Sequence, residues 1–305
     1  MLRIFRKYAS NILLTIFIVT FGFYIYNNRK ELIGLLNFNL SSLLLLSLFF
    51  ILSYIVKVKI NQNLYLTKNI RMSFSETCEL IIKSTAGNLS TPLNLGTGYK
   101  FHYLKKNYNL TYTENLSINI YFSMFINLVY VLILISISLT NYIKGSSIFL
   151  NLTILWLLIF FVGLFLFIIL YKDYKMKFLN FFNAYSLKSL NLSFHKVVNL
   201  FILSSVLILI SVLSHRYVFK LIDLEIDNLQ IVSYVCLLGL ANIIKFTPGN
   251  FGINETVLII SNLYHGITAL DVILVSIVFR FFSWLNILIF TFFLYVQKSY
   301  NKEDK

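Results

Sequence analysis

Charged residues are scarce in this chain of 305 residues. Only 12% of the residues are Asp, Glu, Lys or Arg, whereas 58% are hydrophobic, and a soluble domain carries about 25% charged residues. This composition excludes an ordinary soluble enzyme, because no soluble domain of useful size remains once the apolar segments are set aside. It predicts an all-α, polytopic membrane protein, since helices satisfy their own backbone polar groups in lipid.

Acidic residues are the scarcer of the two charge types. The chain has 12 Asp and Glu against 26 Lys and Arg, which gives a net charge of +14. Such an excess can mark a nucleic-acid-binding protein, but here the basic residues are dispersed between apolar segments and form no basic domain or reading motif. We therefore exclude nucleic acid as a partner. The basic residues fit topology signals better, because Lys and Arg gather in the cytoplasmic loops of membrane proteins.

The chain also lacks the patterns that most catalytic and metal sites need. Its two cysteines, Cys78 and Cys236, lie in apolar or half-apolar segments and are predicted to pack there, and its four histidines show no ligand spacing. No P-loop, nucleophile elbow, zinc-protease motif or D-x-D pair is present. The one acidic cluster, residues 223–227, could hold a hard cation, although a solvated loop is the simpler interpretation. We therefore expect no enzyme activity, no cofactor and no metal.

Proline is almost absent as well, and the two that exist lie in near-copies of one motif. Thr91–Gly96 and Thr247–Gly252 both read T-P-x-N-x-G, and Pro92 and Pro248 are 156 residues apart, close to half of the chain. Both motifs should break a helix, because proline lacks an N–H and glycine frees the backbone. The prolines could simply end helices at the membrane surface. Their repetition favours a duplicated membrane fold whose working site lies at the breaks.

Long apolar runs predict about six spanning helices, because about 20 residues cross the hydrocarbon core of a membrane. Two further segments, 74–92 and 229–247, each end at one of the proline motifs. They are predicted to be half-helices of two re-entrant helical hairpins. The six spanning runs are residues 12–26, 40–56, 117–139, 148–171, 197–213 and 271–296.

The two halves of the chain are predicted to be inverted repeats. A shift of 156 residues superimposes three of the four elements of the first half on the second, so residues 1–305 form one transmembrane domain with repeats at 12–139 and 148–296. With both termini in the cytoplasm, the inner segments hold 18 Lys and Arg and the outer segments hold 5, as the positive-inside rule requires. Each half then has three spanning helices. Because this number is odd, the second half has the opposite orientation across the membrane. If both broken segments crossed the membrane fully, the repeat would be parallel instead.

Three ionisable residues, Glu255, Arg280 and Lys245, lie at predicted membrane depth or beside the second break. An ionisable group there costs roughly 2.5–3.5 kcal/mol, so it usually has a partner or a task. Glu255 and Arg280 form the natural ion pair, which is either structural or functional. In the functional interpretation Arg280 contacts a phosphate, with help from Lys245 and from Lys100 or Lys83. Glu255 then positions Arg280 or contacts an amine. The two motifs would line the same pocket through Asn94 and Asn250 and through the breaks at Pro92, Gly96, Pro248, Gly249 and Gly252.

The second motif resembles that of the lysylphosphatidylglycerol synthase transmembrane family, also called the flippase-like family. The family motif P-G-G-x-G-x-x-E reads here Pro248-Gly249-Asn250-Phe251-Gly252-Ile253-Asn254-Glu255, with Asn250 in place of a usual glycine. Arg280 falls where the family has a later intramembrane arginine. The first motif, from Pro92 to Lys100, is degenerate, because Thr97 and Gly98 stand where an acidic residue usually follows the glycine.

The resemblance covers essentially the whole chain and implies a multi-pass protein of the cytoplasmic membrane of a bacterium or archaeon. It implies translocation or handling of an anionic lipid or lipid-linked glycan in cell-envelope biogenesis, with envelope-synthesis enzymes as further partners. The soluble synthase domain of some members is not expected, because the chain ends at residue 305, soon after the last apolar run. Two alternatives stay open. One is a membrane enzyme acting on a lipid-linked sugar through residues 223–227, and the other is a non-catalytic scaffold of a glycan-synthesis complex.

Overall fold

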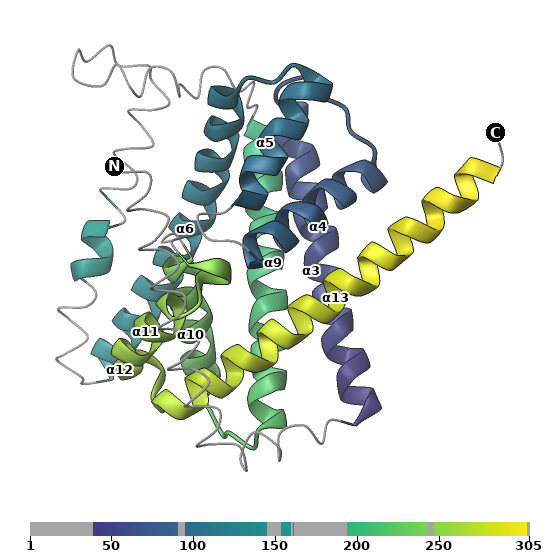
Figure 1. Ribbon diagram of the computed structural model, residues 1–305. Coiled ribbons are helices and arrows are strands. Elements are labelled where there is room, and N and C mark those ends of the chain that lie inside the picture. The colour runs from purple at the N-terminus through teal and green to yellow at the C-terminus, as the bar shows by residue number, and fades with distance from the viewer. Residues whose placement is uncertain are drawn as a thin grey trace, which may run out of the picture.

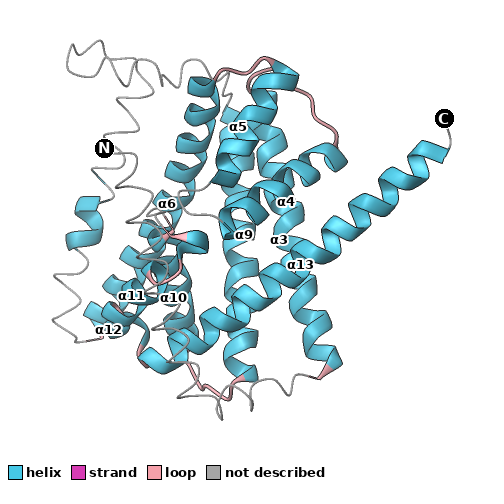
Figure 2. Ribbon diagram, viewed as in Figure 1, coloured by secondary structure: helices cyan, strands magenta, loops and turns pink. Residues whose placement is uncertain are grey.

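The computed structural model is helical throughout its described part (Figure 2). That part comprises residues 39–90, 95–144, 154–159, 161, 194–242 and 247–303. Within it no strand is present, so the all-α prediction is confirmed.

Four of the described helices are long and apolar enough to cross a membrane. They confirm the prediction of a polytopic membrane protein, and each contains one of the apolar runs. Of the other two runs, 12–26 lies outside the described residues, and 148–171 is described as helix only at 154–159 and 161. The four helices are α3 (Leu40–Leu66), α6 (Tyr112–Ile143), α9 (Phe194–Leu221) and α13 (Ala269–Glu303).

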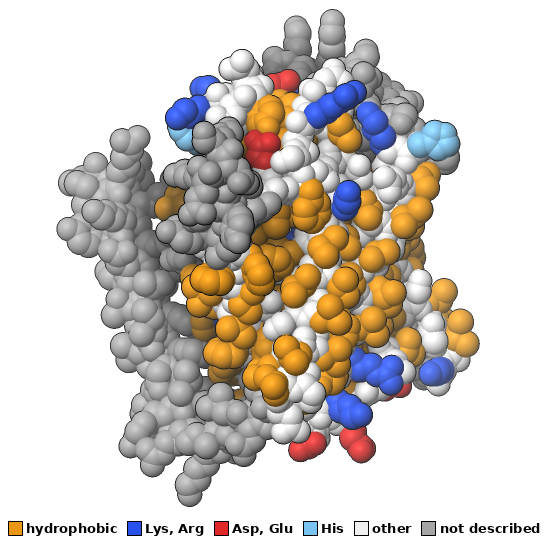
Figure 3. Space-filling model, turned by 90° about the vertical axis from the view of Figure 1, so that its right-hand side faces the viewer, with side chains coloured by type: hydrophobic (Ala, Val, Ile, Leu, Met, Phe, Trp, Pro, Cys, Tyr) orange, Lys and Arg blue, Asp and Glu red, His pale blue; other side chains and the backbone are white. Residues whose placement is uncertain are grey.

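The long helices form the frame of the molecule. α9 packs against α3 and α6, and α13 crosses α3 and α9 obliquely (Figure 1). On the face in Figure 3, hydrophobic side chains cover the middle, and most Lys and Arg side chains lie toward the two ends. Leu44, Leu48 and Leu52 on α3 are among the exposed large apolar side chains. A broad apolar surface of this kind is what contact with lipid requires.

The first proline motif separates two short helices that pack on each other. α4 is described over Phe74–Ser90, within the predicted segment 74–92, and α5 (Leu95–Tyr108) follows the residues 91–94 that are not described. The helices run antiparallel, because the end of α4 contacts the start of α5 and Glu76 near the start of α4 bonds Tyr108 at the end of α5. Gly87 and Gly96 let the backbones touch: a Cβ built on Gly87 would lie 2.7 Å from the Cα of Gly96.

The second motif likewise separates short helices. α10 (Asn228–Ala241) precedes it, the turn η4 (Pro248–Asn250) contains it, and α11 (Ile253–Ile260) and α12 (Asn262–His265) follow. α10 begins at a capping box, in which the Asp227 carboxylate accepts from Leu229 N at 3.2 Å and Gln230 Oε1 accepts from Asp227 N at 3.1 Å. Such caps satisfy N–H groups that the first turn leaves without partners.

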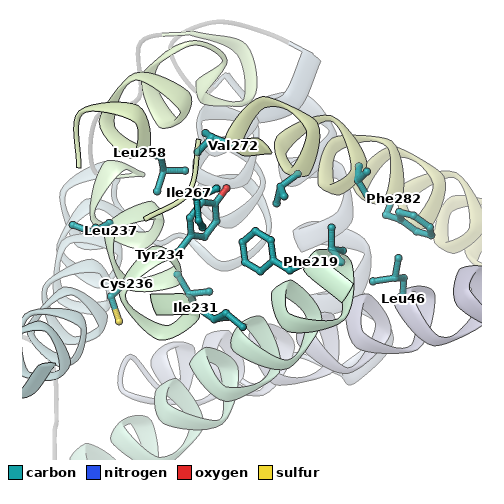
Figure 4. Close-up of a cluster of buried hydrophobic side chains, with 14 of the residues drawn as sticks. Leu46, Phe219, Ile231, Tyr234, Cys236, Leu237, Leu258, Ile267, Val272 and Phe282 are labelled. Carbon is teal, nitrogen blue, oxygen red and sulfur yellow. The ribbon is translucent and has the colours of Figure 1, made fainter. Parts of the chain in front are cut away.

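The largest hydrophobic cluster holds the second broken segment in the frame (Figure 4). Ile231 and Tyr234 of α10 meet Phe219 of α9, Phe282 of α13 and Leu46 of α3, and each is at most 3% exposed. Because these side chains come from four helices, the cluster fixes where the second break lies relative to the spanning helices.

Candidate functional site: a cavity between two broken helices

Arg280 of α13 fastens the second break to the last long helix. Its Nη2 donates to Glu255 Oε1 at 2.8 Å, its Nη1 donates to the carbonyl oxygen of Gly249 at 2.8 Å, and its Nε donates to Ser276 Oγ at 3.2 Å. The guanidinium also lies over the ring of Phe251, 3.8 Å from the ring centre. Arg280 therefore binds both sides of the turn at once, and the predicted Glu255–Arg280 ion pair is present.

Both carboxylate oxygens of Glu255 have partners. Oε1 accepts from Arg280 and from the hydroxyl of Ser276, and Oε2 accepts from Gly252 N at 2.8 Å. The last bond caps the first turn of α11, where a carboxylate is also favoured by the helix dipole. The pair is mostly buried, with side-chain exposures of 16% for Arg280 and 9% for Glu255.

The turn can present a carbonyl to Arg280 because three of its residues adopt left-handed backbone conformations. Gly249 and Asn250 both have φ of 56°, and Gly252 has φ of 79°. Glycine reaches this region without steric cost, and asparagine tolerates it better than most residues. In the motif P-G-N-F-G the two glycines and the asparagine therefore carry the positive φ values of the turn.

The end of α4, just before the first proline motif, lies against the second break. A Cβ on Gly249 would lie 3.0 Å from Leu89 Cδ2 and 3.7 Å from Leu89 Cα, at the end of α4. On the other side of that helix end, Asn88 Oδ1 accepts from Thr97 N at 3.0 Å in the first turn of α5. Positions more than 150 residues apart in the sequence are therefore neighbours in the fold.

Glu76 fixes the opposite end of the α4–α5 hairpin. Its Oε1 accepts from the hydroxyl of Tyr103 at 2.8 Å and from that of Tyr108 at 2.6 Å. Burial and this hydrogen bond raise the pKa of Tyr103 to about 12, so the phenol keeps the proton that it donates. The hairpin is thus tied at both ends, by Asn88 and by Glu76.

A cavity of about 890 Å³ opens where the breaks meet the long helices. It is lined by residues of α3, α4, α5, α6, α9, α10, η4 and α13, including Thr97 and Gly98 after the first break and Gly249 after Pro248. Most of the lining is apolar, but it also carries charged and amide side chains. Lys57, Lys100 and His215 line it together with six asparagines: Asn61, Asn88, Asn119, Asn127, Asn242 and Asn250.

Comparison with known families identifies the chain. The family model described as the lysylphosphatidylglycerol synthase TM region matches residues 9–290. The chain belongs to this family. The resemblance seen in the sequence is therefore confirmed, and the family associates the chain with membrane lipid. No curated protein and no solved structure matches the chain.

The structure divides the residues predicted for the site in this family member into three groups. Lys100, Gly249 and Asn250 line the cavity. Glu255 and Arg280 are not part of the lining. Their ion pair and the bond from Arg280 to the Gly249 carbonyl form a clamp behind the second break. Among the others, Gly96 lies in the α4–α5 contact, Pro248 and Gly252 shape the second turn, and Pro92, Asn94 and Lys245 lie outside the described residues.

Lys83 and the acidic cluster have local roles in the described part of the chain. Lys83 Nζ pairs with Glu79 Oε1 at 2.6 Å, one turn earlier on α4, and its side chain is 50% exposed. Asp227 of the 223–227 cluster caps α10. Among the described residues no group of three His, Cys, Asp or Glu could hold a metal ion.

The sequence contains a pattern of polar residues that predicts the cavity, but dividing the chain into apolar runs leaves this pattern out. Polar residues recur every four positions on two of the spanning helices, so they share one helix face. On α3 the run 40–56 ended just before Lys57, which placed this residue in a cytoplasmic segment, but the helix continues to Leu66. The two stripes, which both line the cavity, are Ser53, Lys57 and Asn61 on α3 and Asn119, Ser123 and Asn127 on α6.

Proposed function

We propose that this protein moves an anionic lipid or lipid-linked glycan between the two leaflets of the cytoplasmic membrane, in cell-envelope biogenesis. The observation that supports this most is the cavity of about 890 Å³, which lysine and asparagine side chains line and which residues beside the first break and within the second break border. An unsatisfied polar group costs several kcal/mol in hydrocarbon, so a headgroup that crosses the membrane needs polar partners on its way. The cavity supplies them while the acyl chains stay in the lipid.

In this proposal the chain is a transporter and not an enzyme, and the halves 12–139 and 148–296 are inverted repeats that open the cavity to each side in turn. The broken segments are re-entrant hairpins whose ends meet inside the membrane, as in transporters with discontinuous helices. Arg280 uses three of the five N–H donors of a guanidinium within the clamp. The remaining donors could reach a phosphate during transport, which stays a prediction.

The cavity also weighs against the scaffold alternative. A scaffold predicts that the two motifs form flat surface turns with no space between them. Here Thr97, Gly98, Gly249 and Asn250 instead border one common space. The enzyme alternative depended on residues 223–227, and no observation favours it.

Filling the cavity tests the proposal. Ser123 lines the cavity in the middle of the α6 stripe, and Ser123→Phe places a ring there. We expect flipping of fluorescent phosphatidylglycerol in proteoliposomes to slow at least about tenfold, because a barrier increase of about 1.4 kcal/mol is sufficient. The fraction of lipid accessible to dithionite over time measures the rate.

Ser136→Phe is the matched control, because Ser136 lies on the same helix, is exposed and is absent from the cavity lining. It makes the same change of side chain on the lipid-facing surface and should flip lipid at the wild-type rate. Equal rates in wild type, Ser123→Phe and Ser136→Phe would remove the cavity from the mechanism. No flipping above protein-free liposomes by the wild type would refute the function itself.

A further inference from the structure

The charges that line the cavity are all of one sign. Lys57 and Lys100 contribute ammonium groups, and no Asp or Glu of the described residues lies in the lining. Two ammonium groups in one cavity attract a phosphate and repel a second amine, and this effect grows as water is excluded. The lining therefore discriminates between headgroups by their charge.

Asn61 holds the Lys100 ammonium group at one end of the cavity, and Lys57 lies one turn earlier on the same helix. Lys100 Nζ donates to Asn61 Oδ1 at 2.8 Å and to Asn119 Oδ1 at 3.4 Å. Lys57 precedes Asn61 by one turn of α3, and Asn61 Nδ2 donates to the Lys57 carbonyl oxygen at 2.8 Å. A phosphate at this end would contact Lys100, and Lys57 adds a second positive charge one turn along the lining of α3.

Lys57 is available to a ligand. Its Nζ lies 5.2 Å from the centre of the Tyr54 ring, and no hydrogen bond or ion pair joins it to another described residue. A lysine ammonium has three donors and no acceptor, so this group suits an anion and cannot accept a bond from an amine.

The carboxylate of Glu255 cannot bind an amine without losing bonds that hold the second break. Both oxygens of Glu255 are already bonded, to Arg280, Ser276 and Gly252, and Glu255 is not part of the lining. An amine-bearing headgroup would thus bring a third positive charge to the lysines with no carboxylate to neutralise it in the described part of the cavity.

The other end of the cavity is polar but carries no fixed charge. His215 is 3% exposed, its Nδ1 bonds the carbonyl oxygen of Ser211 at 2.7 Å, and its ring stacks on Phe279 with centroids 3.9 Å apart. Its Nε2 is buried and has no partner. Asn127 and Ser214 also line the cavity. These groups offer both donors and acceptors, which is what a hydroxyl group needs.

The cavity is longer than a phosphate alone would require. Along α3 its lining runs from Phe49 to Asn61, which corresponds to roughly 18 Å at the helical rise of 1.5 Å per residue. A phosphate at the lysine end therefore leaves room for an uncharged group that extends toward His215.

We infer that the cavity selects lipid headgroups of net negative charge in which a phosphate bears a hydroxylated, uncharged group, such as a polyol or sugar. We also infer that it rejects headgroups with an amine, aminoacylated phosphatidylglycerol included. This inference rests on the proposed function, because it takes the cavity to be the headgroup site. It follows from the cavity lining of this chain and not from the name of its family.

Equilibrium binding of four lipids to the full-length protein in detergent tests the inference, with native mass spectrometry as the readout. Phosphatidylinositol and phosphatidylglycerol are anionic and hydroxylated, whereas phosphatidylethanolamine and lysyl-phosphatidylglycerol carry amines. We expect the first two to bind at least about tenfold more tightly than the last two, as the loss of one charge-assisted hydrogen bond would produce. Lys57→Gln should weaken phosphatidylinositol binding by about the same factor.

Lys59→Gln is the control for general attraction of anionic lipid to a chain with a net charge of +14. Lys59 lies two residues from Lys57 on the same helix, but it is exposed and outside the cavity lining. This variant should bind all four lipids as the wild type does. Equal losses in Lys57→Gln and Lys59→Gln would overturn the inference, and so would equal affinity for lysyl-phosphatidylglycerol and phosphatidylglycerol.

The flip assay separates this inference from the proposed function. Selective binding without flipping would refute transport and leave the cavity's selectivity standing. Flipping of lysyl-phosphatidylglycerol as fast as phosphatidylglycerol would support transport and overturn the selectivity.

Discussion

Replacing Gly96 by alanine is expected to disrupt the α4–α5 hairpin and to abolish function with it. A Cβ at this position would lie 1.9 Å from the carbonyl oxygen of Ser84 and 2.7 Å from the backbone nitrogen of Asn88. Both atoms belong to helix backbone, so neither can rotate away as a side chain could. Overpacking in a core costs about 1–3 kcal/mol and occasionally more. Since backbone must shift here, we expect a loss of at least about 3 kcal/mol in the free energy of unfolding, measured in mixed detergent micelles.

Gly98→Ala is the matched control, because it makes the same change two residues later on the same helix. A Cβ on Gly98 would meet no heavy atom within 4 Å. Alanine is favoured over glycine inside a helix by roughly 0.5–1 kcal/mol, so this variant should be as stable as the wild type or slightly more stable. A stable, active Gly96→Ala protein would mean that the two helices do not touch at Gly96.

The sequence predicted the helical elements well because two physical signals were strong. Apolar runs predicted all four long helices described, and the segments predicted before Pro92 and Pro248 each contain a shorter helix, but α10 ends at Ala241, six residues before the predicted end at 247. The lengths of the spanning helices were predicted less well. The run 40–56 stops at the first lysine, but backbone hydrogen bonds do not depend on side-chain polarity, and α3 continues ten residues further to Leu66.

The candidate site was only partly predictable for a similar reason. Glu255 and Arg280 stand out because opposite charges in an apolar context must find partners. The bond from Arg280 to the Gly249 carbonyl could not be predicted, since it depends on the backbone conformation of the turn. Lys100 was identified only by its closeness to the first motif. Lys57 was missed because a lysine at the end of an apolar run resembles a topology signal.

The relation between the two breaks could not be derived from the sequence either. The repeat showed that they are equivalent in position, but their contact through Leu89 and Gly249 depends on how α4 packs against the second half. The two breaks are held by different kinds of contact, because the residues beside them differ. The second break has an ion pair behind it, whereas the described part of the first is held by neutral Asn88 and the hydroxyl and backbone of Thr97.

Arg280→Ala should be the most destabilising change at the second break. It leaves the mostly buried Glu255 carboxylate without its cation and the Gly249 carbonyl without its donor. Removing one partner of a buried ion pair typically costs about 3–5 kcal/mol. We expect a loss in that range in the free energy of unfolding. Arg216→Ala is the comparison, because Arg216 is an exposed arginine on α9 with no ion pair among the described residues, and surface changes usually stay within about 0.5 kcal/mol.

A double-mutant cycle then separates the ion pair from the rest of the clamp. Glu255→Gln keeps one oxygen that can accept from Gly252 N, but it puts an amide NH2 in place of the oxygen that Ser276 and Arg280 bond, and it removes the charge that Arg280 neutralises. In the Arg280→Met background there is no longer a cation to leave unpaired, so the same change should cost less there, or even stabilise the protein. The coupling between the two positions is therefore expected to exceed about 1 kcal/mol, within the range of contacting residues. Additive effects would show that Arg280 acts mainly through the Gly249 carbonyl, and the turn at the second break would then be held by its backbone bond and not by charge.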